Sequence, residues 1–276
     1  MPSFNGYRAI LLDLDGTLLD RTSRVSPRNA AAVRAAVDAG LEVWLATGRS
    51  VASTRPTHSA LALRTPACCY NGAVLYCGVT ARWLAHLALE DEAVADLLDF
   101  CLSRDVFFLA FHEDTKYALA PRTDGHRRFL RLIDDVRIVD RAAIPARGAT
   151  RISFTGEPAD LEEFDRRFGA RGFHQERFPM SVIPGFESFT SIVCDVQNAT
   201  CRGKAEAVHF LEAERRIAPE AVVAIGDHLN DLSMFRAAGL GVAMGNAPDE
   251  VKRQAKLVIG RNDEDGVGRF IEDLLK

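Results

Sequence analysis

The sequence lacks any long apolar run, and this absence bears on where the protein works. No stretch approaches the roughly 20 apolar residues that a membrane-spanning helix needs. The apolar residues 9–12 are followed at once by acids, unlike the core of a signal peptide. We therefore expect a cytoplasmic protein that does not act at a membrane. The net charge of −4 also gives no electrostatic reason to expect nucleic acid as a partner.

The cysteines lack the spacing of a zinc site or of a redox pair. There are six of them, with no Cys-x-x-Cys motif and no companion histidine pattern. We therefore expect reduced, mostly buried thiols, as is usual in a cytoplasmic protein. The sequence also contains no internal repeat and no low-complexity tract, so neither a repeat architecture nor dominant disorder is expected.

The length and composition are those of a globular protein with room for two domains. The chain has 276 residues, of which 47% are hydrophobic and 26% are charged. Because the overall charge is negative, an anionic substrate would have to be attracted by local positive charge or by a bound metal.

Two carboxylates follow the first apolar strand, in the stretch Asp13-Leu14-Asp15-Gly16-Thr17. Alternation along a strand directs Asp13 and Asp15 to the same side of the chain. Two like charges brought together either raise one pKa or recruit a divalent metal. An Asp-Gly pair can also mark only a turn, so the other segments must decide between chemistry and a solvated strand end.

Strand and helix patterns alternate in the first part of the chain. Apolar strands are expected at residues 9–12, 41–46 and 67–70, and each runs into a polar or glycine turn at its carboxyl end. Open parallel α/β sheets bind their ligands at this edge. Between the first two strands, Ser26 and Gly40 are suited to cap the ends of a helix.

The pattern changes in the middle of the chain and then returns. Short strand pairs between helices, including strands near residues 178–183 and 190–195, favour an antiparallel α+β module. The fold class we expect is α/β, with a Rossmann-like doubly wound parallel sheet core that carries this α+β module as an insertion. The core is assigned to residues 1–82 and 199–276, and the insertion to residues 83–198.

Three further segments offer groups suited to an anion or a cation. Thr47-Gly48-Arg49 supplies a hydroxyl, a backbone N–H and a guanidinium, although it could be an ordinary strand-to-helix turn. Lys204 stands where a helix begins, and a cation is unfavourable there unless an anion lies nearby. The stretch from Asp227 to Asp231 adds carboxylate and amide oxygens, of which Asp231 could partly serve as a helix cap.

The order of these pieces resembles the haloacid dehalogenase superfamily of phosphohydrolases. The matching motifs are Asp13-x-Asp15-Gly-Thr, Thr47-Gly-Arg, Lys204 and Gly226-Asp227-x-x-Asn230-Asp231. Asn71-Gly72-Ala73 and the stretches around residues 237–247 and 262–267 are similar to the Cof-type branch, whose type IIB cap is inserted between the second and third motifs. The resemblance covers both core segments and is weak over the insertion.

This resemblance implies a phosphatase mechanism with Asp13 as the nucleophile and Asp15 as the general acid and base. It implies Mg²⁺ bound by the side chains of Asp13 and Asp227 and by the backbone carbonyl of Asp15, with Asp231 holding metal-bound water. The residues implied to bind the substrate are Thr47, Gly48, Arg49, Asn71, Lys204 and Asn230.

The insertion would act as a lid that reads the leaving group. Its candidate contacts are His112, Lys116, Arg122, Arg151 and Glu187, each expected more often at a solvated surface than in a site. The substrate implied is a small phosphorylated metabolite such as a sugar phosphate, pyridoxal phosphate or a nucleotide-like monoester, and the protein could be a monomer or a homodimer.

Three alternatives to a phosphatase stay open at this point. A phosphomutase or phosphotransferase could use the same scaffold and the same nucleophile. A signalling receiver domain also places acids, a Thr and a Lys around Mg²⁺, although it would carry neither the insertion nor an equivalent of Asp15. A purely structural or binding role would require inactivity against every phosphate ester.

Overall fold

The structure is a computed structural model, and it describes residues 6–133, 135–183 and 185–276. The chain forms two compact units, of which unit 1 comprises residues 1–86 and 202–276 and unit 2 comprises residues 87–201. The division expected from the sequence differs from these units by a few residues at each junction. The strand Arg82–His86 is the reason at the first junction, because it pairs with a strand of unit 1.

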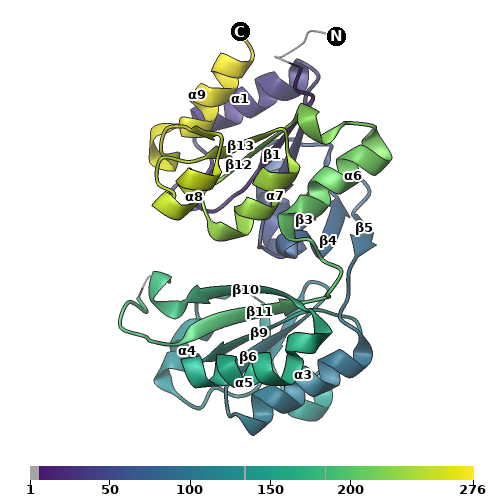
Figure 1. The fold of residues 1–276 in the computed structure, drawn as a ribbon, viewed down its shortest axis with the longest axis vertical. Helices are drawn as coiled ribbons and strands as arrows, with labels where there is room; N and C mark the ends of the chain where they lie inside the picture. Colours follow the sequence, from purple (N-terminus) through teal and green to yellow (C-terminus); the bar gives the residue numbers. More distant parts are fainter. Residues whose placement is uncertain (1–5, 134, 184) are drawn as a thin grey trace. The chain divides into compact units, whose positions relative to one another are not determined.

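The helices and strands of unit 1 occur in two segments of the chain (Figure 1). The first segment holds β1 (Ala9–Leu12), α1 (Pro27–Asp38), β2 (Glu42–Ala46), α2 (Val51–Ala60), β3 (Pro66–Cys69), β4 (Val74–Cys77) and β5 (Arg82–His86). The second holds α6 (Glu206–Arg215), β12 (Val222–Gly226), α7 (Leu232–Ala237), β13 (Leu240–Ala243), α8 (Asp249–Gln254), β14 (Leu257–Val258) and α9 (Gly266–Leu274).

The strands of unit 1 form one sheet, in the order β14-β13-β12-β1-β2-β3-β4-β5. The strands from β14 to β3 run parallel, whereas β4 and β5 continue the sheet in antiparallel fashion. The α/β fold class expected from the sequence is confirmed. The antiparallel strands β4 and β5 at one edge of the sheet were not part of that expectation. Since β1 lies between β2 and β12, the two segments of the chain meet at the centre of the sheet.

Helices pack against this sheet. On one face, α6, α7 and α8 contribute Leu211, Phe235 and Val251 to a buried cluster with Leu11 and Trp44 of the strands. The helices α1 and α9 pack against each other (Figure 1). Apart from the half-buried Glu42 at the start of β2, the central strands are buried, so the sheet supports the loops at its carboxyl edge.

Unit 2 is a second α+β unit. It contains α3 (Asp91–Ser103), β6 (Phe107–His112), β7 (Thr115–Ala118), α4 (Asp124–Leu130), β8 (Val136–Ile138), β9 (Ala149–Gly156), α5 (Pro158–Phe168), β10 (His174–Pro179) and β11 (Ile192–Gln197). Its sheet has the order β10-β11-β9-β6-β7-β8, and only the β7–β8 pair is parallel.

One face of the unit 2 sheet is covered by α3 and α5. Phe100 of α3 packs on Phe154 of β9 and on Phe164 of α5, with ring centroids 5.6 and 5.5 Å apart. The prediction of a strand near residues 178–183 is wrong about its position. The strand there is β10, which ends at Pro179, and a short 3-10 helix (Met180–Val182) follows. Proline has no N–H to continue a ladder, which accounts for the early end.

No helix in the described ranges is both long enough and apolar enough to cross a membrane. The described cysteines form no disulfide with one another, and among them only Cys77 is less than fully buried. Burial raises the pKa of the Cys194 thiol to about 12, so this sulfur stays protonated and unreactive.

Candidate active site

The residues that directly follow three parallel strands lie at one edge of the unit 1 sheet. Asp13 follows β1, Thr47 follows β2 and Asp227 follows β12. Since these strands are parallel neighbours, their carboxyl ends meet at the same edge. The last four residues of each of these strands are uncharged and buried, so the functional polar groups appear where the strands end.

Lys204 joins two carboxylates in the interior of this edge. Its Nζ donates hydrogen bonds to Asp13 Oδ1 and to Asp231 Oδ1, each 2.6 Å long. All three side chains are buried, and Lys204 is only 1% exposed. The lysine lies in the 3-10 helix Gly203–Ala205, directly before α6 begins. A buried ammonium requires such partners, because an unpaired charge in this environment is strongly unfavourable.

This cluster contains more acidic groups than basic ones, and the pKa values of its members reflect this. Burial, together with repulsion from Asp231 and Asp227, raises the pKa of Asp13 well above its ordinary value, although Lys204 opposes the shift. Burial and repulsion from Asp231 also raise the pKa of Asp227 to about 7. Burial alone would lower the pKa of Lys204, but the two carboxylates outweigh it and the pKa rises. The cluster therefore has more negative charge than one lysine neutralises, and an additional cation would be bound favourably.

Three carboxylates are close enough to share a metal ion. Asp13, Asp227 and Asp231 each present an oxygen atom, and these atoms lie within 4.8 Å of one another. The oxygens of Asp231 already have donors: Lys204 binds Oδ1, and the backbone N–H groups of Asp227 and His228 bind Oδ2 at 2.8 and 2.9 Å. Asp231 therefore organises the turn after β12. Its three donors include a cation, whereas the side-chain donors to Asp227 are neutral and Asp13 pairs with Lys204 through Oδ1, so Asp13 and Asp227 are the better candidates for direct ligands.

Asp15 has different surroundings from Asp13. Its carboxylate is 59% exposed and forms an ion pair with Arg49. The Nε of Arg49 donates to Asp15 Oδ2 at 2.7 Å, and its second terminal nitrogen donates to Oδ1. The two acids of the first motif are thus divided, with one buried against a lysine and the other at the surface against an arginine.

Asn71 and Asn230 also meet at this edge. Asn230 Nδ2 donates to Asn71 Oδ1 at 3.0 Å. Asn71 and the preceding Tyr70 both have left-handed backbone conformations, with φ of 50° and 51°. Two consecutive non-glycine residues in this conformation store strain that is often found at functional sites. At Gly48 a Cβ atom would lie only 3.0 Å from Asn71 Oδ1, so a larger residue would crowd this contact.

The candidate residues of unit 2 have several environments. His112, Lys116 and Arg151 are buried, contrary to the surface positions expected for them. Arg151 donates to Asp195 at 2.8 Å and lies over the Phe111 ring, with 4.2 Å from its Cζ to the ring centroid. These partners explain how a cation is tolerated inside the unit. Glu187 is exposed, and its side chain accepts from the N–H of Gly185.

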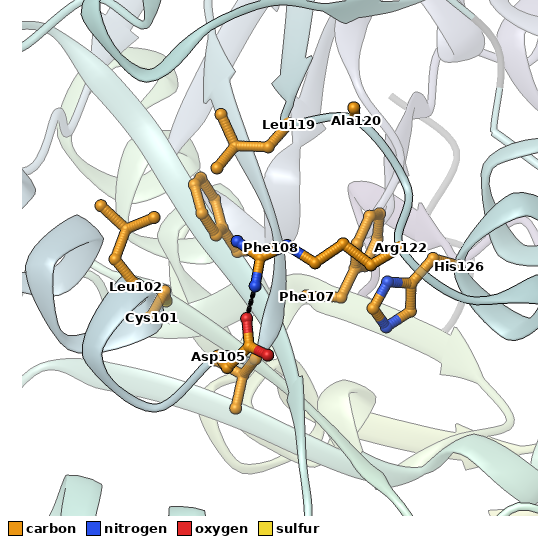
Figure 2. Close-up of a pocket in the computed structure, with 10 residues that line it drawn as sticks. Cys101, Leu102, Asp105, Phe107, Phe108, Leu119, Ala120, Arg122 and His126 are labelled. Carbon is orange, nitrogen blue, oxygen red and sulfur yellow. Dashed lines mark ion pairs between the residues drawn. The ribbon is translucent and has the colours of Figure 1, made fainter.

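Arg122 lies at a small pocket of unit 2. Figure 2 shows its guanidinium beside the Asp105 carboxylate, with which it forms an ion pair, while His126 lies near the other end of the Arg122 side chain. The pocket volume is about 30 Å³, far below the roughly 300–1,000 Å³ of typical small-molecule sites. It is therefore too small to hold a metabolite.

Two residues at the edge of the unit 1 sheet have contacts that the sequence motifs did not identify. Thr17 Oγ1 donates to Asp227 Oδ1 at 3.1 Å. Asn246 Nδ2 donates to Asp227 Oδ2 at 3.2 Å and to the carbonyl of Gly16 at 2.8 Å. Both residues stand in segments that resemble the family, but nothing in the sequence showed that they would meet at Asp227.

Comparison with known proteins assigns the chain to a family. The model of the haloacid dehalogenase-like hydrolases matches residues 10–271. Pyridoxal phosphate phosphatase YbhA of Escherichia coli is 31% identical, over 96% of this chain and 97% of that protein. The Bacillus subtilis 5-amino-6-(5-phospho-D-ribitylamino)uracil phosphatase YwtE is 28% identical, over 97% and 98%.

A solved structure shares the fold. The phosphatase BT1666 of Bacteroides thetaiotaomicron superposes with a TM-score of 0.83 at 21% identity, and the match covers 99% of this chain and 97% of that one. The match to the family model and to the sequence relatives confirms the resemblance inferred from the sequence motifs. The chain belongs to the haloacid dehalogenase-like hydrolase family and is a hydrolase.

Proposed function

We propose that this protein is a Mg²⁺-dependent phosphatase that hydrolyses small phosphorylated metabolites by way of a phosphoryl group carried on Asp13. The observation that carries the proposal is the buried arrangement of Asp13, Lys204, Asp227 and Asp231 at the carboxyl edge of the sheet. The phosphatases named among its relatives act on phosphorylated compounds of this size.

The residues present suit a magnesium ion. The donors are hard carboxylate oxygens, which Mg²⁺ prefers. Raised pKa values at Asp13 and Asp227 are the result expected where carboxylates converge without enough positive charge. The side chains of Asp13 and Asp227 would hold the ion, with the backbone carbonyl of Asp15. When bound, Mg²⁺ would offset the repulsion between these carboxylates and a phosphate dianion.

Asp13 is the proposed nucleophile. A carboxylate oxygen of Asp13 attacks phosphorus, the bond from phosphorus to the leaving alcohol oxygen breaks, and a phosphoryl group remains on Asp13. Water then attacks the same phosphorus, and the bond to Asp13 breaks to release phosphate. The contact with Lys204 orients the nucleophile, because it holds Asp13 Oδ1 in a buried position.

Asp15 is the proposed proton-transfer residue. It donates a proton to the leaving oxygen in the first step and accepts one from the attacking water in the second. Its side chain is exposed, so it can reach the leaving group of a bound ester. Asp13 and Asp15 can divide the chemistry in this way because their surroundings differ.

The phosphate oxygens would be bound by neutral and cationic donors at the same edge. Thr47, the backbone N–H of Gly48, Lys204 and Asn230 are the proposed donors, with Arg49 and Asn71 beside them. Such donors stabilise the charge on the equatorial oxygens during phosphoryl transfer. The contact between Asn71 and Asn230 gives the amide of Asn230 a fixed position.

We further propose that unit 2 is a type IIB cap that reads the leaving group. Lys116 and Arg151 pair across the sheet with Phe111, so these three side chains share one face. That face is opposite to the one covered by α3 and α5, because Ala110 and Ile152 point toward those helices. Buried cations next to an aromatic ring suit a leaving group with planar or anionic character.

A screen of phosphate release tests this proposal. The purified protein is assayed with pyridoxal phosphate, sugar phosphates, nucleotides and ribitylaminouracil phosphate, in Mg²⁺ and again with EDTA. We expect release from at least one monoester in Mg²⁺ and none in EDTA. Isomer formation without release would indicate a phosphomutase, and inactivity toward the whole panel would argue against the proposal.

A further inference from the structure

The carboxamide of Asn246 contacts three separate segments of unit 1. Asn246 lies in the loop between β13 and α8. Its Nδ2 donates to the carbonyl of Gly16 at 2.8 Å and to Asp227 Oδ2 at 3.2 Å, while its Oδ1 accepts from the backbone N–H of Asn262 at 3.0 Å. One side chain thus connects the loop after β1, the turn after β12 and the segment before α9.

These contacts fix the orientation of the amide. The backbone N–H of Asn262 can only donate, so the group facing it must be the oxygen of Asn246. The carbonyl of Gly16 can only accept, and an ionised Asp227 carboxylate also only accepts, so the group facing them must be the nitrogen. A flipped amide would lose all three hydrogen bonds, and the position of Nδ2 beside Asp227 is therefore determined by the network.

Asp227 is held at both of its oxygens. Thr17 Oγ1 binds Oδ1 at 3.1 Å and Asn246 Nδ2 binds Oδ2 at 3.2 Å. Both donors are neutral, whereas Asp13 and Asp231 are paired with the ammonium of Lys204. A neutral donor orients a carboxylate without neutralising its negative charge. The carboxylate also keeps lone pairs that can bind a cation.

A second amide anchors the same network. Asn262 is buried, and its Nδ2 donates to the carbonyl of Leu19 at 2.9 Å. The segment that supplies the N–H to Asn246 is therefore itself tied to the loop that follows β1. As a result, Asn246 has little freedom to move away from Asp227.

We propose that Asn246 is a positioning residue for the metal site, acting by setting the plane of the Asp227 carboxylate. This inference rests on the proposed function, in which Asp227 is a metal ligand. Groups that orient a metal ligand commonly contribute 10–100-fold to metal affinity. A purely structural role, in which Asn246 only ties three loops together, would affect stability and leave metal binding unchanged.

The test measures Mg²⁺ affinity and thermal stability separately. Isothermal titration with MgCl₂ gives the Kd of the purified, full-length wild type, Asn246→Ala and Asn29→Ala, and Tm is recorded without Mg²⁺. Asn29 is a matched control, because it is buried and its Oδ1 accepts from Gly268 N–H at 2.8 Å between α1 and α9. We expect Asn246→Ala to weaken Mg²⁺ binding about 10–100-fold, and Asn29→Ala to lower Tm with the Kd unchanged.

The outcomes separate the two hypotheses. A wild type that binds Mg²⁺ together with an Asn246→Ala variant of equal affinity would overturn the role of Asn246 and leave the proposed function standing. A wild type that does not bind Mg²⁺ would overturn both. If Asn246→Ala does not fold, Asn246→Ser, which is smaller but still polar, is measured in its place with the same expected loss.

Discussion

Arg49 holds both carboxylate oxygens of Asp15. Its Nε donates to Oδ2 at 2.7 Å and a terminal nitrogen donates to Oδ1. Because Asp15 is 59% exposed, the pair contributes little to stability, on the order of 0–1 kcal/mol. Its importance lies in orienting the residue that is proposed to transfer protons, and in placing a guanidinium next to the site where phosphate would bind.

Substitution of Arg49 should therefore affect catalysis more than folding. We expect Arg49→Ala to lower kcat/KM by about 10–100-fold, since orienting contacts of this kind have effects of that size, with Tm nearly unchanged. Arg49→Lys should recover only part of the loss, because an ammonium cannot make the two-point contact. Steady-state kinetics with the best substrate of the panel check this, and wild-type kcat/KM in Arg49→Ala would contradict it.

Lys204 should be important for stability as well as for activity. Lys204→Met leaves the buried carboxylates of Asp13 and Asp231 without their cation. Breaking a buried pair in this way costs about 3–5 kcal/mol, which urea unfolding without Mg²⁺ at pH 8 would detect. The control is Lys276→Met, whose exposed pair with Asp273 should matter little. If Lys204→Met lowered the free energy of unfolding no more than Lys276→Met does, the buried carboxylates would not depend on Lys204 for their stability.

Magnesium binding should depend on pH. The pKa of Asp227 is about 7 in the folded protein against an ordinary value of 3.8. Between about pH 4 and pH 7 this carboxyl therefore keeps a proton in the folded, metal-free protein that it has lost in the unfolded chain. Its contribution to stability falls as pH rises through this range and levels off above about pH 7.

The metal must displace that proton. Below pH 7 we expect the Kd for Mg²⁺ to rise about tenfold per pH unit, with proton release detectable by titration in buffers of different ionisation enthalpy. The thermal stabilisation by Mg²⁺ should accordingly be larger at pH 8 than at pH 6. An affinity that does not change between pH 5.5 and 7 would contradict this assignment.

Gly16 is a further point at which the metal site can be tested. Its φ is +77°, and a Cβ atom there would lie 2.2 Å from Asp227 Oδ2. Gly16→Ala should therefore displace the Asp227 carboxylate and abolish detectable Mg²⁺ binding.

Gly40 is a matched control for this substitution. It has a φ of +94°, but nothing lies within 4 Å of an added Cβ. Gly40→Ala should therefore show only the left-handed backbone penalty of about 1–2 kcal/mol and keep its Mg²⁺ affinity. Equal Mg²⁺ affinity in the two variants would argue against close packing of Asp227 on Gly16.

The sequence allowed much of unit 1 to be predicted, for a simple physical reason. Apolar runs mark the buried strands, and polar residues at their carboxyl ends must meet when the strands are parallel neighbours. This is why Asp13, Thr47 and Asp227 could be assigned to one edge before the structure was known. The antiparallel strands β4 and β5 and the helix α2, which contains Pro56, were not foreseen because their local patterns are weak.

Side-chain partners were less predictable than strand positions. Nothing in the spacing of Lys204 shows that its ammonium would bridge two carboxylates, since these contacts span 191 and 27 residues of sequence. Arg151 looked like a surface cation, but Asp195 and Phe111 allow it to be buried. Such contacts arise from tertiary packing, which local sequence patterns do not encode.

The most direct test of the central claim is phosphate release by Asp13→Asn. The amide keeps the shape of the side chain but is a poor nucleophile, so no phosphoryl group can be transferred to residue 13. With Mg²⁺ and the best substrate of the panel, we expect turnover to be abolished in a variant whose Tm shows that it is folded. Phosphate release by purified Asp13→Asn at a rate close to that of the wild type would contradict the account.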